Sequence, residues 1–202
     1  MKKNFFFNEI STALESISQF QIREKKILDE LLKPKHKFEK LGVQNTIVFF
    51  GSAIKLKDTK KITPKIKKMA EYYNQAEKLS YKITRWVNTK FKNPNHCVVC
   101  SGGGPGIMEA ANKGAKQAGG QSIGLNIKIK YEQIPNKYQS EELKLQFHYF
   151  FMRKFWFSYL AKAIIVFPGG FGTLDKLFEI YTLIKTNKIH NYAPIILFGK
   201  DF

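Results

Sequence analysis

Residues 163–173 read Ala163-Ile164-Ile165-Val166-Phe167-Pro168-Gly169-Gly170-Phe171-Gly172-Thr173, and this stretch decides the fold. Its first five residues are apolar and partly β-branched, which predicts a strand buried on both faces of a sheet. The proline and glycines end the strand, and a helix is expected from Leu174 to about Thr186. A buried strand that passes through a glycine turn into a helix is typical of a parallel sheet covered by helices.

The same succession of strand, turn and helix recurs on both sides of this stretch. Further buried strands are expected at 46–50, 97–100, 122–127 and 194–198, and further helices at 64–89, 105–118 and 153–162. The alternation predicts an α/β fold with a doubly wound, mostly parallel, Rossmann-like sheet and helices on both faces.

The N-terminal part has a different pattern. From Asn8 to Leu32 the apolar residues have a mostly helical spacing, and this helix is expected to end before Pro34. We therefore expect a helical N-terminal extension over residues 1–45 and a Rossmann-like nucleotide-binding domain over residues 46–202. The chain stops directly after the last expected strand, before a helix that would cover it, so the domain is either truncated at its C-terminus or has a natural short end.

The formal net charge of the 202 residues is +18, which raises nucleic acid or an anionic membrane as partners. The lysines are spread along the chain, however, and the densest basic stretch, Lys55–Lys68, has no interleaved aromatic residues for base stacking. No apolar run approaches the roughly 20 residues that span a bilayer, and the first residues lack a signal-peptide pattern. We expect a cytoplasmic protein without a membrane partner, and nucleic-acid binding is an alternative that rests on charge alone.

Cys97 and Cys100 have a spacing that occurs in redox and zinc motifs, but they lie in a predicted buried strand, where residues three apart point to opposite faces. The sequence has no second cysteine pair to complete a zinc site, and its four histidines are scattered. We therefore expect two buried structural cysteines, no metal and no cofactor.

Three turns follow predicted strands at the sheet edge where open α/β sheets bind their ligands: Gly51-Ser52, Gly102-Gly103-Gly104-Pro105-Gly106 and Pro168–Thr173. Glycine lets the backbone approach an oxyanion closely, and a helix N-terminus with a threonine hydroxyl favours phosphate. The two glycine-rich turns together predict a site for a nucleoside 5′-monophosphate.

A dinucleotide or a triphosphate fits this pattern less well. Ile107 stands where the third glycine of G-x-G-x-x-G would fall, and the strand at 122–127 ends near Asn126, not at an acid for a ribose diol. The sequence also has no G-x-x-x-x-G-K-[ST] motif. The spacing therefore favours a mononucleotide.

Three motifs together resemble the LONELY GUY family, long mislabelled as lysine decarboxylases: Ser101–Ala110, Met152-Arg153-Lys154 and Pro168–Thr173. The resemblance covers roughly residue 46 to the end of the chain. It implies a homodimer that hydrolyses the N-glycosidic bond of AMP or of cytokinin ribotides, giving free base and ribose 5-phosphate. The substrate-binding residues expected from the turns and the resemblance are Gly51, Ser52, Gly102, Gly103, Gly104, Gly106, Met108, Glu109, Lys154, Gly169, Gly170, Gly172, Thr173 and Lys176.

The second glycine motif of that family reads P-G-G-x-G-T-x-x-E, and its glutamate forms a catalytic couple with an arginine that Arg153 matches. At the place of the glutamate this chain has Lys176. Cleavage of the N-glycosidic bond builds positive charge on the ribose, which a carboxylate stabilises and an ammonium opposes. Arg153 is too basic to donate a proton at neutral pH, so it would anchor phosphate or polarise the leaving base. We expect Lys176 to preserve nucleotide binding and to reduce hydrolysis.

Asp175 and Glu179 are the nearest carboxylates to Lys176 along the chain. Asp175 is rotated about 100° around the helix from the expected position, and we take Arg153 and Asp175 as the candidate catalytic residues. Thr173 is the expected N-cap, so that Lys176 would occupy a capping-box position where a cation is locally unfavourable. The alternative function is that of a non-catalytic nucleotide-binding protein, or of a carrier similar to the molybdenum-cofactor carriers, which have a similar glycine-rich architecture.

Overall fold

A computed structural model describes residues 2–55, 63–129, 134–189 and 193–200, with side chains from residue 20 onward. The chain forms two compact units, Met1–His36 and Lys37–Phe202. Helix α1 spans Lys2–Leu41 and contains Pro34, so the expectation that it ends before this proline is wrong. Its last turns belong to the second unit, where buried Phe38 packs edge-on against Trp156 with the ring centroids 5.3 Å apart. This contact stabilises the turns that follow the proline, although proline removes one helical hydrogen bond.

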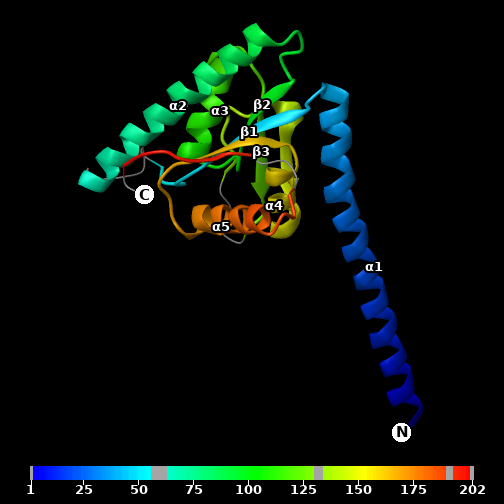
Figure 1. The fold of residues 1–202 in the computed structure, drawn as a ribbon. Coiled ribbons are helices and arrows are strands. Elements are labelled where there is room, and N and C mark those ends of the chain that lie inside the picture. Colours follow the sequence, from blue (N-terminus) through cyan, green and yellow to red (C-terminus); the bar gives the residue numbers. More distant parts are fainter. Residues whose placement is uncertain (1, 56–62, 130–133, 190–192, 201–202) are drawn as a thin grey trace. The chain divides into compact units, whose positions relative to one another are not determined.

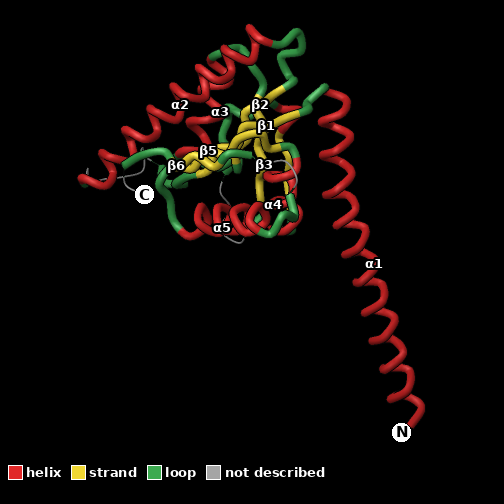
Figure 2. The backbone as a smooth tube through the Cα atoms, viewed as in Figure 1, coloured by secondary structure: helices red, strands yellow, loops and turns green. Residues whose placement is uncertain are grey.

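The second unit is built on a six-stranded parallel sheet with the order β4-β3-β2-β1-β5-β6, which Figure 2 shows as the yellow segments. The strands are β1 (Asn45–Phe50), β2 (Cys97–Ser101), β3 (Ser122–Ile127), β4 (Lys144–Phe147), β5 (Ala161–Val166) and β6 (Ile195–Leu197). The chain builds the sheet outward from β1 to β4 and then returns to the other side of β1 with β5. The carboxyl ends of β1 and β5 therefore lie at the topological switch point, where open α/β sheets bind ligands.

Helices cover both faces of the sheet (Figure 1). Helices α2 (Pro64–Lys90) and α3 (Ile107–Gln117) lie on one face, and α4 (Phe150–Tyr159) and α5 (Phe171–Lys185) lie on the other. Thr63 caps α2 by accepting a hydrogen bond from the Ile66 N–H, and Pro64 occupies its first turn. A core of buried side chains, among them Phe49, Val99 and Ile165, fills the space between the sheet, α2 and α3. The predicted α/β Rossmann-like fold is confirmed.

The element boundaries differ from the sequence expectations at the glycine turns. Helix α3 begins at Ile107, after Gly106, and α5 begins at Phe171 with Gly170 as its N-cap. The expectation that Thr173 caps α5 is therefore wrong, because Gly170 accepts the first hydrogen bonds, from the Thr173 and Leu174 N–H groups. Lys176 lies beyond the first turn of α5, where a cation meets less of the positive end of the helix dipole.

Candidate functional site

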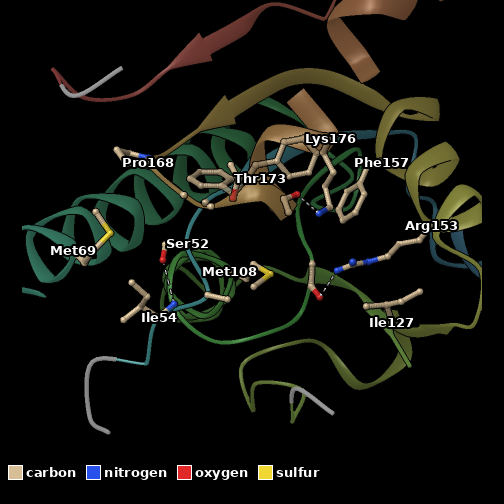
Figure 3. A pocket seen from close by; sticks show the side chains of 18 of the residues that line it. Ser52, Ile54, Met69, Met108, Ile127, Arg153, Phe157, Pro168, Thr173 and Lys176 are labelled. Atoms are coloured by element: carbon tan, nitrogen blue, oxygen red, sulfur yellow. Dashed lines mark hydrogen bonds between the residues drawn. The ribbon is translucent and has the colours of Figure 1, made fainter. Parts of the chain in front are cut away.

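A cavity of about 740 Å³ opens at the carboxyl ends of β1 and β5 (Figure 3). This volume is within the range of sites that hold small ligands. Its walls come from the turn after β1, from both glycine turns and from helices α2, α4 and α5. Among the described residues that line it, Lys65, Arg153 and Lys176 are cationic and none is acidic.

Ser52 joins the three turns through its backbone. Its N–H donates to the Pro168 carbonyl at 3.1 Å, and its carbonyl accepts from the Ile107 N–H at 3.0 Å. Its hydroxyl accepts from the Ile54 N–H at 3.2 Å and so folds the chain after β1 (Figure 3). Ser52 is itself buried. Ser52 therefore fixes the positions of the two glycine turns relative to each other. The Ile107 N–H at the start of α3 donates its hydrogen bond within the protein and is not available to a ligand.

The first glycine turn is buried and held by side-chain amides. Asn136 Nδ2 donates to the Gly103 and Gly104 carbonyls at 3.0 and 2.9 Å, and Gln139 Nε2 donates to the Gly103 carbonyl at 2.7 Å. Asn136 Nδ2 also donates to Asn112 Oδ1 at 3.0 Å. Because the carbonyls of this turn are satisfied inside the protein, Gly103 and Gly104 serve to shape the turn, and only Gly102 of the turn lines the cavity.

Arg153 enters the cavity from α4 as a buried cation. Its Nη2 donates to the Gly102 carbonyl at 3.1 Å (Figure 3). Its Nε donates to the Leu125 carbonyl at 2.6 Å. A Cβ at Gly102 would stand 2.6 Å from Arg153 Nη2, so the absence of a side chain there allows the guanidinium to approach. Burial lowers the pKa of Arg153 to about 10, and the guanidinium stays charged at neutral pH. Arg153 thus places a fixed positive charge at the cavity wall.

The second glycine turn lies open at the cavity. Gly169, Gly170 and Gly172 line it and are exposed, while Thr173 lines it from the first turn of α5. The first N–H groups of a helix have no carbonyl partners within it, so this terminus suits an anion. The turn therefore offers backbone donors, a hydroxyl and the helix dipole to a ligand phosphate.

Lys176 points back along α5 toward this turn. Its Nζ donates to the Gly172 carbonyl at 2.7 Å and lies 5.8 Å from the ring centroid of Phe50 and 6.0 Å from that of Phe157 (Figure 3). Burial and the positive charge of Arg153 lower the pKa of Lys176 to about 8. Among the described residues, no carboxylate lies within the 4.0 Å of an ion pair with either Arg153 or Lys176. The cavity is therefore electropositive.

The carboxylates near Lys176 are paired with another lysine. Lys154 Nζ lies 3.4 Å from Asp175 Oδ1 and 2.5 Å from Glu179 Oε2. The Glu179 hydrogen bond is the main cause that raises the pKa of Lys154. Asp175, Glu179 and Lys154 do not line the cavity. Glu109 also lies outside it, where it accepts from the Tyr73 hydroxyl at 3.3 Å, a contact that together with burial raises the pKa of Tyr73.

The structure brings most of the sequence-predicted site residues to one cavity. The cavity is lined by Gly51, Ser52, Gly102, Met108, Arg153, Gly169, Gly170, Gly172, Thr173 and Lys176, but not by Gly103, Gly104, Gly106, Glu109, Lys154 or Asp175. Gly106 has a φ of 68°, and a Cβ there would collide with the Ser52 carbonyl oxygen, so this glycine serves the turn.

Sequence reasoning missed the apolar lining and the amides behind the first turn. The apolar lining includes Phe50, Met69, Ile127 and Phe157, which come from four different elements. Phe50 directly precedes Gly51, and this adjacency was the only local sequence signal for the apolar lining. Asn126 carries no ligand function, because its Nδ2 donates to the Leu145 carbonyl at 3.1 Å and to Gln139 Oε1 at 2.8 Å.

The described residues offer no metal site and no membrane-spanning helix. Within the described residues, no group of three or more His, Cys, Asp and Glu side chains could hold a metal ion. Burial raises the pKa of both cysteine thiols, and Cys100 is fully buried. None of the helices in the described segments has the length and apolar character needed to cross a bilayer.

Comparisons with known proteins bear on the C-terminal part of the chain. Residues 108–202 match the family model described as "Possible lysine decarboxylase". The X-ray structure of TM1055, a target of the Northeast Structural Genomics Consortium, is similar with a TM-score of 0.51 and 20% identity. The similarity covers 77% of this chain and 75% of TM1055 and supports the fold. None of the curated proteins compared with the sequence matches it.

Proposed function

We propose that the cavity binds a nucleoside 5′-monophosphate such as AMP. Residues 108–202 match the family model described as "Possible lysine decarboxylase", and the motifs of the chain resemble the LONELY GUY family, which supports this proposal. The phosphate lies at the start of α5 and the base in the apolar part of the cavity. Lys176 strongly reduces the hydrolysis of the N-glycosidic bond that the family resemblance implies.

The observation that carries this proposal is the charge of the cavity wall. Lys65, Arg153 and Lys176 line the cavity, whereas no described lining residue is acidic. A dianionic phosphate would pair with these cations and with the N-terminus of α5. The rings of Phe50 and Phe157 and the thioether of Met108 would contact the apolar face of a base.

The same charges oppose cleavage. The transition state of N-glycosidic hydrolysis carries positive charge on the ribose, which a cation-lined wall destabilises. Asp175 was the candidate to replace the missing glutamate, but it is half exposed and lies on the side of Lys154. In the described structure the carboxylate that this reaction requires is therefore absent from the cavity wall.

The test is a calorimetric titration with AMP and with adenosine, combined with an assay for adenine release. We expect AMP to bind, adenosine to bind at least about 10-fold more weakly because it lacks the phosphate, and adenine release to be slow. Thr173→Val should weaken AMP binding because it removes the hydroxyl at the start of α5. Thr182→Val is the matched control, since the Thr182 hydroxyl donates to the Phe178 carbonyl at 2.7 Å further along the same helix. Equal affinities for AMP and adenosine would contradict the proposal.

A second candidate is a non-catalytic carrier of a pterin phosphate, similar to the molybdenum-cofactor carriers. The cation-lined cavity without a described acid is the observation that favours it. Competition between AMP and a pterin phosphate separates the two candidates. Stronger binding of the pterin phosphate would replace the nucleotide proposal.

We also propose that the protein is a cytoplasmic homodimer. Support comes from the family resemblance and from exposed aromatic side chains on α4 and α5, which are Phe150, Phe151, Phe155, Tyr159, Phe178 and Tyr181. Exposed apolar groups of this size commonly mark interfaces. Light scattering should give the mass of a dimer for the unchanged chain and of a monomer for Phe178→Glu, and a monomeric unchanged chain would contradict this part of the proposal.

A further inference from the structure

Two aromatic rings and one carbonyl, but no carboxylate of the described residues, compensate the ammonium ion of Lys176. Its Nζ faces the rings of Phe50 and Phe157 at 5.8 and 6.0 Å, and its hydrogen-bond acceptor is the Gly172 carbonyl. Lys154, which directly follows Arg153 in α4, shows the contrast, because two carboxylates pair with it. Among the described residues, Lys176 has no such partner.

The charges around Lys176 favour its neutral form. Burial is the largest cause that lowers its pKa to about 8, and Arg153 and Lys154 of α4 act in the same direction. Asp175 and Glu179 of its own helix act against it. Near pH 8 a larger fraction of Lys176 side chains is therefore neutral than of an ordinary lysine, whose pKa is about 10.4. A neutral amine is a nucleophile, and an ammonium is not.

We propose that Lys176 is a carbamylation site, at which its neutral amine adds to the carbon of CO₂ and becomes a carbamate. One N–C bond forms, one C–O π bond breaks, and the amine loses one proton to solvent, so that Nζ–COO⁻ results. The product carries a carboxylate at the position where the resembling family has a glutamate. No oxidant, reductant or metal enters the step.

Arg153 supplies the counter-charge for such a carboxylate. Its guanidinium has five N–H groups, and the hydrogen bonds to the Leu125 and Gly102 carbonyls use two of them. Arg153 contributes to the lowered pKa of Lys176 by its positive charge, so the two groups interact electrostatically. The cavity of about 740 Å³ has room for the three additional atoms of the carbamate.

The carbamate would change the chemistry of the cavity from binding to cleavage. An anionic group at position 176 stabilises positive charge on a ribose, which the ammonium does not. This consequence rests on the proposed function, whereas formation of the carbamate does not. Hydrolysis of AMP would then depend on CO₂.

The test is ¹³C NMR of the protein in buffer that contains ¹³C-labelled bicarbonate, at about pH 8 and without nucleotide. We expect a carbamate carbon signal that is absent from Lys176→Arg, because arginine stays protonated, and that persists in Lys154→Arg, because Lys154 is paired with two carboxylates. An α-amino terminus also forms a carbamate, and its signal stays in all three proteins. A spectrum of the unchanged chain that equals that of Lys176→Arg would overturn the proposal.

A second measurement does not depend on the folding of a variant. Alkylation of carbamate oxygens with a trialkyloxonium salt, followed by peptide mass spectrometry, should place the added carboxyl group on the peptide with Lys176 in the unchanged chain. Modification of other lysines without Lys176 would overturn the proposal. Adenine release from AMP should rise with CO₂ at constant pH in the unchanged chain and not in Lys176→Arg. If AMP does not bind, the proposed function fails, and the NMR signal still decides on the carbamate.

Discussion

The two turns are both rich in glycine but have opposite surroundings. Gly103 and Gly104 of the first turn are buried, and amide side chains bind their carbonyls. Gly170 and Gly172 of the second turn are exposed, and a Cβ at either would meet no atom within 4 Å. The first turn is thus a fixed part of the protein interior, and the second is the surface that a ligand would touch. Glycine content alone does not distinguish the two roles.

The largest expected effect comes from breaking the support of the first turn. Asn136→Ala removes one amide that donates to the Gly103 and Gly104 carbonyls and to Asn112 Oδ1, and leaves these buried acceptors without it. We expect the free energy of unfolding to fall by about 2–4 kcal/mol, measured by urea denaturation. Gln117→Ala, at an exposed position of α3, is the control and should change it by less than about 0.5 kcal/mol. A loss from Asn136→Ala as small as the control would refute the support role.

The second prediction compares a methyl group at each turn. A Cβ in Gly102→Ala would stand 2.6 Å from Arg153 Nη2 and from Met108 Sδ, so the guanidinium must move. We expect AMP to bind about 10-fold more weakly, which corresponds to about 1.4 kcal/mol, in calorimetric titrations. Gly172→Ala adds its methyl group to open space and should preserve the free energy of unfolding. If both variants lose the same AMP affinity and have the same free energy of unfolding, the contrast between the turns is wrong.

The third prediction concerns the charge of Lys176. Its pKa of about 8 means that the ammonium is present below this pH and is lost as the pH rises through it. Arg153, Lys154, Asp175 and Glu179 are the charged groups that act on it. In CO₂-free buffer, AMP affinity should fall about 3- to 10-fold between pH 7 and 9. Lys176→Arg should abolish this dependence, and a fall of the same size in that variant would assign it to another group.

The smallest expected effect is at the ion pairs behind the second turn. Lys154→Met removes the pairs with Asp175 and Glu179, whose side chains are 53% and 36% exposed. Solvent screens such pairs, and we expect a loss of only about 0.5–1 kcal/mol in thermal or urea unfolding. Ser158→Ala on the same helix is a control of similar exposure. A loss above about 3 kcal/mol would mean that Lys154 has a structural role beyond these pairs.

The sequence allowed prediction of the parts of the fold that local patterns specify. Apolar runs identified β1, β2 and β5, because strands buried on both faces are mostly apolar. Strand β3 contains the polar residues Ser122 and Asn126 and was placed by its position after the glycines that end the preceding helix. Edge strand β4 was not assigned, because it alternates exposed Lys144 and Gln146 with buried Leu145 and Phe147 and follows a polar stretch. The sequence prediction placed the N-cap of α5 at Thr173, three residues after the observed N-cap Gly170. A threonine hydroxyl can cap a helix and is recognised in a sequence, whereas a glycine N-cap has no side chain that would indicate it.

The sequence predicted those parts of the candidate site that lie within its motifs. The backbone turns, Arg153 and Lys176 are adjacent to strand and helix ends, and the sequence order placed them at one edge of the sheet. The supporting amides of Asn136 and Gln139 act across more than 30 residues of chain, and no local pattern reveals such contacts. The separation of Asp175 from the cavity depends on the rotation of α5 and on its contact with Lys154, which only the structure gives.

The most direct test of the central claim is adenine release from AMP by Lys176→Glu in CO₂-free buffer, measured beside the unchanged chain and Lys176→Gln. A carboxylate at this position should raise the rate by about 100-fold or more, within the range of single catalytic carboxyl groups. Lys176→Gln removes the amine without adding a carboxylate and should stay slow. Adenine release by the unchanged chain at the rate of Lys176→Glu would contradict the account, because hydrolysis would then proceed without a carboxylate at position 176.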